Sequence, residues 1–225
     1  MAAQPLRPPS DGRTGIYRCR LTDDSIHPEK VDVADTQRAA ASPPVIAGVP
    51  SGGVLLRRYD VMRDAPLVPP IMHMLHRAYR KQVDMGLRPL AGRQDADVTL
   101  RRCSSGECYL AIDSESTQPI GVIILNEIEP DTGPPWFMRQ GVQSFSQLAV
   151  DPSVQGRGVG RQLLEVVERR AKERNAEELA LSMAEPDDDL RRFYQRHGYR
   201  IVGIWKWPYT NYQSLIMSKT VVKPG

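Results

Sequence analysis

The segment from Gln155 to Arg161 has the residue types and spacing of an anion-binding loop, with glycines at 156, 158 and 160. An apolar stretch typical of a strand precedes it, and a stretch with the periodicity of an amphipathic helix follows it. The first amides of a helix have no intrahelical partner, and the helix dipole adds about half a positive charge there. Glycines let the backbone approach a phosphate closely. Taken alone, the segment predicts either a phosphate-binding loop or a glycine-rich turn that binds nothing.

Two common phosphate-binding motifs do not account for this segment. The Walker A pattern G-x-x-x-x-G-K-[ST] occurs nowhere in the sequence. The dinucleotide-binding pattern G-x-G-x-x-G, started from Gly156, requires glycine at the position of Arg161. The loop therefore belongs to neither of these classes of nucleotide site.

Two segments together resemble a known enzyme family. The pattern Gln155-x-x-Gly158-x-Gly160, after a Val-Asp-Pro strand end, resembles motif A of the GNAT superfamily of N-acetyltransferases. Residues 193–199, Phe-Tyr-Gln-Arg-His-Gly-Tyr, resemble the Phe-Tyr-x-x-x-Gly-Phe/Tyr segment of the same family at the expected distance. The resemblance spans residues 54–221 and is weaker in the N-terminal part.

The resemblance implies acetyl-CoA as the cosubstrate, and we expect no metal. It assigns the coenzyme pyrophosphate to the backbone amides of Gln155, Gly156, Arg157, Gly158, Val159, Gly160 and Arg161. The side chains of Arg157 and Arg161 are expected to add charge-assisted contacts. The pantetheine arm is expected to pair, like an extra strand, with the backbone of Leu148, Ala149 and Val150.

The chemistry that the resemblance implies is aminolysis of a thioester. A main-chain amide near Leu148 or Val150 is expected to stabilise the developing oxyanion. Tyr194 matches the family tyrosine that protonates the leaving thiolate, a role that suits a phenol. The alternative is that Tyr194 is only an aromatic residue on the apolar face of a helix.

This chain departs from the family pattern at several positions. Asp187 and Leu190 stand where many members have asparagine and alanine, which puts the local packing in question. Ser146 and Gln147 stand on the central strand where many members carry a carboxylate base. A base is therefore either another carboxylate acting through water or absent, with the amine arriving deprotonated; the carboxylates considered are Glu127, Glu129 and Glu185.

The acceptor is predicted to be the primary amine of a small molecule or of a peptide. The alternative function is a non-catalytic acyl-CoA-binding sensor or adaptor, which the missing strand carboxylate favours and the presence of Tyr194 disfavours. Residues 205–212 contain Trp205, Trp207, Tyr209 and Tyr212. Such a segment either lines an acceptor pocket or caps the core.

Apolar periodicity predicts the elements that position these residues. Strands are expected over residues 54–59, 108–113, 121–125, 144–150, 179–184, 201–206 and 213–221. Helices are expected over residues 69–86, 159–174 and 186–198, and a loop or weak short helix over residues 87–97. The order strand–helix–strand–helix implies a parallel pair inside a mostly antiparallel sheet. We therefore expect an α/β (α+β) fold with helices flanking one mixed sheet, the GNAT fold of the resemblance.

The chain of 225 residues suits one domain with an appendage. Residues 1–53 hold seven of the 19 prolines and a single aromatic residue, Tyr17. Such a segment buries too little surface to offset its ordering entropy. We predict a disordered tail over residues 1–53 and an N-acetyltransferase domain over residues 54–225. Deletion of residues 1–50 is then expected to leave coenzyme binding intact.

Charge, hydropathy and cysteine number argue against some classes of partner and indicate a cellular compartment. The net charge of +3 disfavours a nucleic-acid partner, and no apolar run approaches the roughly 20 residues of a membrane-spanning helix. A homodimer is left open. An odd number of cysteines without a secretory signal indicates reduced thiols and a cytoplasmic protein. The arginine-rich start weakly resembles an organelle-targeting peptide, although prolines interrupt any helix there.

The cysteine and histidine spacings do not favour a metal site. Cys103 and Cys108 have no second ligand pair at zinc-site spacing. His73 and His76 lie three residues apart on an expected helix, where they are either solvated or share a metal. Solvation is the favoured interpretation of this pair.

Overall fold

The computed structural model describes residues 53–127 and 133–221. The predicted tail therefore lies outside the described residues except for Gly53, and so does Glu129. The division of the chain into a tail and a domain at residue 53 stays a prediction.

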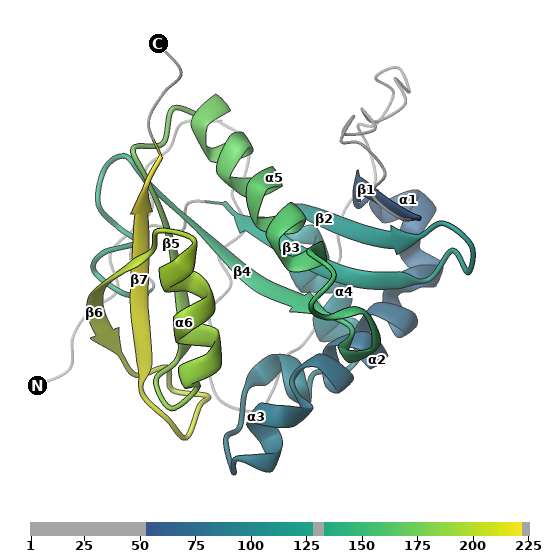
Figure 1. Cartoon of the computed structure of the whole chain (residues 1–225), viewed down its shortest axis with the longest axis horizontal. Helices are drawn as coiled ribbons and strands as arrows, with labels where there is room; N and C mark the ends of the chain where they lie inside the picture. Colours follow the sequence, from purple (N-terminus) through teal and green to yellow (C-terminus); the bar gives the residue numbers. More distant parts are fainter. Residues whose placement is uncertain (1–52, 128–132, 222–225) are drawn as a thin grey trace, which may run out of the picture. The chain divides into compact units, whose positions relative to one another are not determined.

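One mixed sheet of seven strands, in the order β1-β2-β3-β4-β5-β7-β6, organises the described part of the chain (Figure 1). The strands are β1 (Val54–Arg58), β2 (Gly106–Asp113), β3 (Pro119–Asn126), β4 (Val142–Val150), β5 (Glu178–Ala184), β6 (Arg200–Trp205) and β7 (Ser214–Thr220). Strands β4 and β5 run parallel, and every other neighbouring pair is antiparallel. The predicted fold, with one parallel pair in a mostly antiparallel sheet, is confirmed.

Apolar clusters cover both faces of this sheet. Along β2, Tyr109 and Ala111 belong to one cluster, while Cys108, Leu110 and Ile112 belong to the other. Successive side chains of a strand point to opposite faces, so this alternation places one cluster on each face. Because both faces are covered, β2 and β3 appear in the sequence as unbroken apolar runs.

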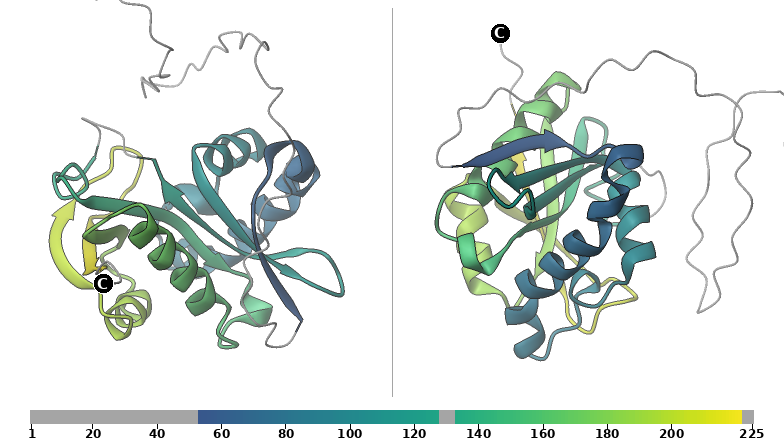
Figure 2. Two further views of the ribbon diagram at one scale, coloured as in Figure 1. Left: turned by 90° about the horizontal axis from the view of Figure 1, so that it is seen from above. Right: turned by 90° about the vertical axis from the view of Figure 1, so that its right-hand side faces the viewer.

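Helices cover each face from a different part of the chain (Figure 2). Helices α5 (Val159–Glu173) and α6 (Asp188–Arg196) contribute to one cluster, and α2 (Val68–Ala78) and α4 (Ala96–Ser104) to the other. The remaining short helices are α1 (Val61–Asp64), α3 (Arg80–Asp84) and the 3-10 turns η1 (Ala65–Leu67), η2 (Leu90–Gly92) and η3 (Pro152–Val154).

The helix predicted over residues 69–86 is two helices that meet at Tyr79. This residue has φ −90° and ψ 0°, so α2 ends at Ala78 and α3 begins at Arg80. After the break, Gln82 Nε2 donates to Asp187 Oδ2 at 2.9 Å, which joins α3 to the start of α6. This contact spans 105 positions of sequence, and apolar periodicity carries no information about it.

Helix α4 is an element that the apolar pattern did not indicate. The loop or weak helix expected over residues 87–97 contains only η2, and α4 begins at its end. Asp95 forms the N-cap, where its side chain accepts a hydrogen bond from the Val98 amide at 2.7 Å. The buried side chains of α4 are Thr99 and Cys103, so no stripe of large aliphatic residues marked it.

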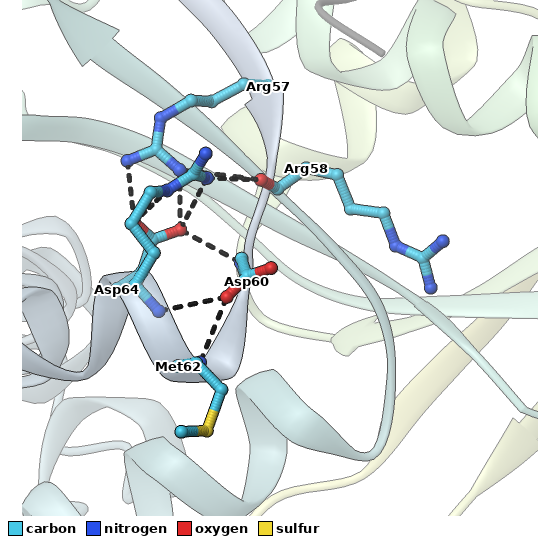
Figure 3. A network of polar contacts seen from close by, with 6 residues as sticks. Arg57, Arg58, Asp60, Met62 and Asp64 are labelled. Carbon is cyan, nitrogen blue, oxygen red and sulfur yellow. Dashed lines mark hydrogen bonds and ion pairs between the residues drawn. The ribbon is translucent and has the colours of Figure 1, made fainter. Parts of the chain in front are cut away.

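A buried carboxylate ties β1 to α1 (Figure 3). The side chain of Asp64 accepts hydrogen bonds from Arg57 at 2.5 and 3.0 Å, from Arg63 at 2.9 and 3.0 Å, and from the Asp60 amide at 2.9 Å. Burial by itself raises the pKa of Asp64, but the bonds from Arg63 and Arg57 outweigh it and hold the pKa well below its usual range.

We expect Asp64→Asn to lower the free energy of unfolding by about 1.5 kcal/mol, because an amide replaces a charged acceptor of several hydrogen bonds. A carboxyl whose folded pKa is depressed stabilises the fold above its unfolded pKa, and this contribution is lost as pH falls through the folded value. The difference between the two proteins should therefore shrink below about pH 4. Urea unfolding at pH 7 and at pH 3 measures both quantities, and an equal difference at both pH values would contradict the electrostatic explanation.

Candidate active site

Strands β4 and β5 separate at the point where a ligand would have to enter. They pair at only three positions, which end at Ser144 and Ala180, and the described strands show no pairing between them beyond these residues (Figure 1). The predicted coenzyme strand, Leu148 to Val150, lies in the diverging part of β4. Its backbone is therefore without a strand partner on the β5 side within the described structure.

A bulge distorts the same stretch of β4. The pairing with β3 shifts between Val122↔Ala149 and Ile124↔Ser146. Gln147 lies in this bulge with φ 53°, a left-handed backbone conformation that is uncommon for a residue other than glycine. Bulges reorient side chains and break the regular pairing, and they are frequent next to active sites.

The predicted phosphate loop follows β4 directly and leads into α5. Asp151 forms the N-cap of η3, accepts a bond from the Ser153 amide at 3.0 Å and pairs with the Arg77 guanidinium at 2.6 Å. Burial favours a higher pKa for Asp151, but the bonds from Ser153 and Arg77 lower it below its usual value. At the helix start, no side chain of the described residues caps α5, since its N-cap is Gly158. The first amides of a 15-residue helix are thus available to an anion.

The three glycines of the loop differ in whether their backbone conformation requires glycine. Gly156 and Gly158 have φ of 77° and 85°, which other residues rarely adopt. A Cβ placed on Gly156 would meet no described heavy atom within 4 Å, and one on Gly158 would meet only Gln162 at 4.0 Å. A Cβ on Gly160 would lie 3.5 Å from Val150, an ordinary contact. The backbone therefore requires glycine at 156 and 158, whereas alanine fits at 160.

Two of the three long polar side chains of the predicted loop bond to other residues of the protein. Gln155 Nε2 donates to the Val150 carbonyl at 3.0 Å and so fastens the loop to β4. Arg161 pairs with Glu165 along α5 at 2.7 Å. Arg157 is exposed and forms no ion pair with the described residues. Of the three side chains, Arg157 is the one that stays available to a phosphate.

Tyr194 lies on α6 beside the opening between β4 and β5. Its side chain is 4% exposed, and its ring centroid lies 6.1 Å from Phe145, the first residue of β4 beyond the parallel pairing. Burial raises the pKa of Tyr194, and Tyr79 and Asp187 raise it further. The phenol is therefore held in its neutral form, which carries the proton. Its hydroxyl forms no hydrogen bond to the described residues.

Both departures from the family pattern near Tyr194 have a structural role. Asp187 is buried at 5% exposure and caps α6, where its Oδ1 accepts from the Leu190 amide at 3.2 Å. Leu190 packs against the apolar cluster on this face. The asparagine position is thus occupied by a carboxylate that joins α3 to α6 through Gln82.

A known protein family contains both the glycine loop and the tyrosine of this site. The sequence profile of the acetyltransferase (GNAT) family matches residues 69–199, which is more than half of the chain and includes the loop and Tyr194. The chain belongs to the GNAT acetyltransferase family. It is accordingly an acyltransferase.

Solved acetyltransferases share the fold of this GNAT protein. The ribosomal-protein-S18-alanine N-acetyltransferase from Escherichia coli gives a TM-score of 0.55 at 15% identity, over 76% of this chain and 96% of that one. PaiA N-acetyltransferase from Thermoplasma acidophilum, in complex with coenzyme A, gives 0.56 at 14%, over 74% and 98%. A GNAT acetyltransferase from Elizabethkingia anophelis with acetyl-CoA bound gives 0.51 at 17%, over 75% and 98%. At such identities the likeness establishes the fold alone. No curated protein sequence is significantly similar to this chain.

Of the carboxylates considered as a base, the two that the structure describes follow different strands, Glu127 after β3 and Glu185 after β5. Glu127 pairs with Arg174 at 3.0 Å, at the end of α5 opposite to the glycine loop. Glu129 lies outside the described residues. Glu185 directly follows β5, and its backbone amide donates to the Gln213 carbonyl at 3.0 Å. Ser146, on the central strand, donates to Asn126 Oδ1 at 2.8 Å.

A chain of amides, which the sequence did not indicate, runs from β4 of the acetyltransferase to α4. Gln147 Oε1 accepts from Gln94 Nε2 at 3.4 Å, and Gln94 Oε1 accepts from Arg102 Nη1 at 3.0 Å. Both glutamines are buried, at 5% and 2% exposure. Gln147 lies 53 positions from Gln94 in the sequence, so only the folded chain brings it to this pair.

The aromatic connection between β6 and β7 packs against the segment after α3. Trp207 stacks on Tyr209 with 5.6 Å between ring centroids, and Asn211 accepts a bond from the Arg88 amide at 2.8 Å. Burial raises the pKa of Tyr209 and raises that of Tyr212 to about 12. The connection both covers apolar surface and places phenols near Arg102, whose charge acts on Tyr209.

Metal ligands are not gathered in the described part of the acetyltransferase. Residues 53–127 and 133–221 contain no group of three His, Cys, Asp or Glu residues that could hold a metal ion. His76 bonds the Gln94 carbonyl at 2.8 Å, and Cys103 and Cys108 are buried free thiols. None of the helices in this part is long and apolar enough to cross a membrane. The cytoplasmic location inferred from the cysteines stays a prediction.

Proposed function

We propose that this acetyltransferase transfers the acetyl group of acetyl-CoA to the primary amine of a small molecule or peptide. The observation that carries the proposal is the position of Tyr194 and the uncapped start of α5 at the two ends of the opening between β4 and β5. The opening offers a backbone strand, an anion site and a proton donor in one continuous path.

Coenzyme binding at this path rests on complementary chemistry. The pyrophosphate accepts bonds from the first amides of α5, with the left-handed Gly156 and Gly158 keeping the approach open. The pantetheine arm pairs with the backbone of β4 from Leu148 to Val150, where β5 has diverged. The coenzyme A and acetyl-CoA bound to two acetyltransferases of the same fold support acetyl-CoA as the cosubstrate.

The reaction then follows from the groups around the thioester. The neutral amine attacks the acetyl carbonyl carbon, a C–N bond forms, and a backbone amide of the 148–150 segment stabilises the oxyanion. The C–S bond breaks, the hydroxyl of Tyr194 gives its proton to the leaving thiolate, and the tyrosinate regains a proton from water. The amine loses its proton to water, because the central strand has Ser146 and Gln147 where a carboxylate base would stand.

A solved protein with the same fold supports an amine of a peptide or small molecule as the acceptor. An alanine N-acetyltransferase acting on a ribosomal protein has the same fold. We assign the acceptor to the side of the site where the aromatic connection between β6 and β7 contacts the segment after α3. There Arg88 bonds Asn211, and Arg93 bonds the Tyr209 carbonyl.

Two measurements test the proposal. Coenzyme A should raise the unfolding temperature, because a ligand at 100 times its Kd stabilises a protein by about 2.7 kcal/mol. Free-thiol release from acetyl-CoA, followed with a library of amines, should show turnover with at least one of them. Stabilisation without turnover on any amine would favour the sensor or adaptor alternative. Absence of stabilisation would overturn both functions.

A further inference from the structure

One partly buried arginine has no carboxylate partner in the described structure. Among the described residues, the arginines that are not exposed are Arg57, Arg102, Arg170, Arg174 and Arg191. Four of them pair with carboxylates at N–O distances of 2.5 to 2.9 Å. Arg102 forms no such pair with residues 53–127 or 133–221.

The surroundings of Arg102 make the lack of a carboxylate partner unusual. Its Nη1 donates to Gln94 Oε1 at 3.0 Å, and its charge acts on the phenols of Tyr79 and Tyr209. Burial lowers the pKa of Arg102, yet a guanidinium stays protonated at neutral pH. A desolvated cation without a counter-charge is destabilising. The fold therefore holds a positive charge here whose partner the described residues do not supply.

A buried donor without a partner among the described residues lies on the other side of Gln94. Gln147 Nε2 is buried and has no hydrogen-bond partner among the described residues, while its Oε1 accepts from Gln94. A buried N–H that is left unpaired carries its full desolvation penalty. The amide of Gln94 thus lies between Arg102, which has no described carboxylate partner, and the Nε2 of Gln147, which has no described acceptor.

These donors adjoin the reacting bond of the proposed function. Gln147 immediately precedes Leu148, in the β4 bulge beside the proposed thioester site. Gln94 joins Arg102 to this bulge, because it accepts from Arg102 at 3.0 Å and donates to Gln147 at 3.4 Å. A ligand held by Arg102 and Gln147 would therefore occupy the acceptor side of the site.

We propose that Arg102 and Gln147 bind a carboxylate of the acceptor, so that the substrate is an amine that also carries a carboxylate group. The inference rests on the proposed function and names its substrate class. A guanidinium binds a carboxylate through paired hydrogen bonds, and the amide adds another donor without further charge. The single positive charge of Arg102 matches the single negative charge of a carboxylate, whereas a dianionic phosphate would remain half compensated.

The experiment compares amines that differ only in this charge. The pairs are γ-aminobutyrate with γ-aminobutyramide and the dipeptide Gly-Gly with its C-terminal amide, and rates are expressed per neutral amine. For the wild type we expect kcat/KM to be roughly 10- to 100-fold higher for the carboxylates, mainly through KM, as for loss of a charge-assisted hydrogen bond. Aminoethyl phosphate is a third arm, and its preference over the carboxylates would overturn the carboxylate assignment.

Arg102→Gln keeps a polar side chain and removes the charge. It should reduce the preference for carboxylates to less than about threefold, mainly by raising the KM of the carboxylate substrates. Arg101→Gln is the matched control, because Arg101 is the adjacent, exposed arginine of α4. Arg102→Lys should restore part of the preference. A full preference in Arg102→Gln, or an equal loss in Arg101→Gln, would overturn the proposal.

A binding measurement separates this proposal from the proposed function. Thermal unfolding of each variant with coenzyme A alone reports whether the fold and the coenzyme site are intact. Addition of γ-aminobutyrate to the coenzyme A complex should stabilise the wild type further and leave Arg102→Gln unchanged. If no amine is acetylated, the proposed function is wrong, and this stabilisation still decides the carboxylate site. Lack of any stabilisation of the wild type by either carboxylate would overturn it.

Discussion

Replacing Tyr194 with phenylalanine is expected to lower kcat by about 100-fold and to change the Kd for coenzyme A by less than about threefold. The ring keeps its place among Phe145, Phe193 and Tyr199, so the packing of α6 is preserved. Only the hydroxyl is lost, and with it the proposed proton donor to the leaving thiolate. Steady-state thiol release gives kcat, and calorimetric titration gives the Kd.

Tyr199→Phe is the matched control for this prediction. Tyr199 is also buried, its ring lies 5.7 Å from that of Tyr194, and its hydroxyl donates to Glu168 at 3.2 Å. Removing this hydroxyl should cost about 1 kcal/mol of stability and leave kcat within about threefold of the wild type. A similar loss of kcat in both variants would show that packing, and not proton donation, explains the effect.

The pH dependence offers a further readout of the same residue. Because the pKa of Tyr194 is raised above its usual value, the phenol should stay protonated throughout the working range of the enzyme. The wild type and Tyr194→Phe should therefore show the same inflections in kcat against pH up to about pH 10, at different heights. An alkaline limb that vanishes in the variant would mean that Tyr194 titrates in this range.

Gly158→Ala is expected to raise the Kd for coenzyme A at least tenfold. A residue with a Cβ is destabilised by roughly 1–2 kcal/mol in the left-handed conformation that Gly158 has at φ 85°. The free loop should relax to another conformation, and binding must then restore the strained one. The new methyl group also points into the open side of the loop, where no described heavy atom lies closer than Gln162. Calorimetric titration with coenzyme A measures the change.

Gly160→Ala makes the same chemical change two residues later and serves as the control. The backbone of Gly160 is not left-handed, and a Cβ there would lie at ordinary contact distances, 3.5 Å from Val150 and 3.8 Å from Phe193. Alanine is favoured over glycine within a helix by up to about 1 kcal/mol, so this variant should be slightly more stable. Its affinity for coenzyme A should not change. Equal losses of affinity at the two positions would contradict the conformational explanation.

The sequence already determined the features that depend on neighbouring residues. The glycine loop was predictable because left-handed backbone and an uncapped helix start require particular residue types at particular positions, as at Gly156 and Gly158. The strands and α5 were predictable because burial on fixed faces imposes apolar patterns. The pairing of β4 with β5 followed from element order, since a parallel pair needs a crossover helix such as α5.

The tertiary structure alone decided which distant side chains meet. The end of α2 at Tyr79, the start of α4 and the amide chain depend on contacts such as Gln94 with Gln147, which are 53 positions apart. Whether Arg102 is exposed, like Arg101, or desolvated without a described counter-charge depends on what packs around α4. Local patterns of type and spacing set backbone conformation, but the desolvation of a charge depends on everything that surrounds it. For that reason the anion-binding loop was visible in the sequence, whereas the proposed carboxylate site became visible only in the fold.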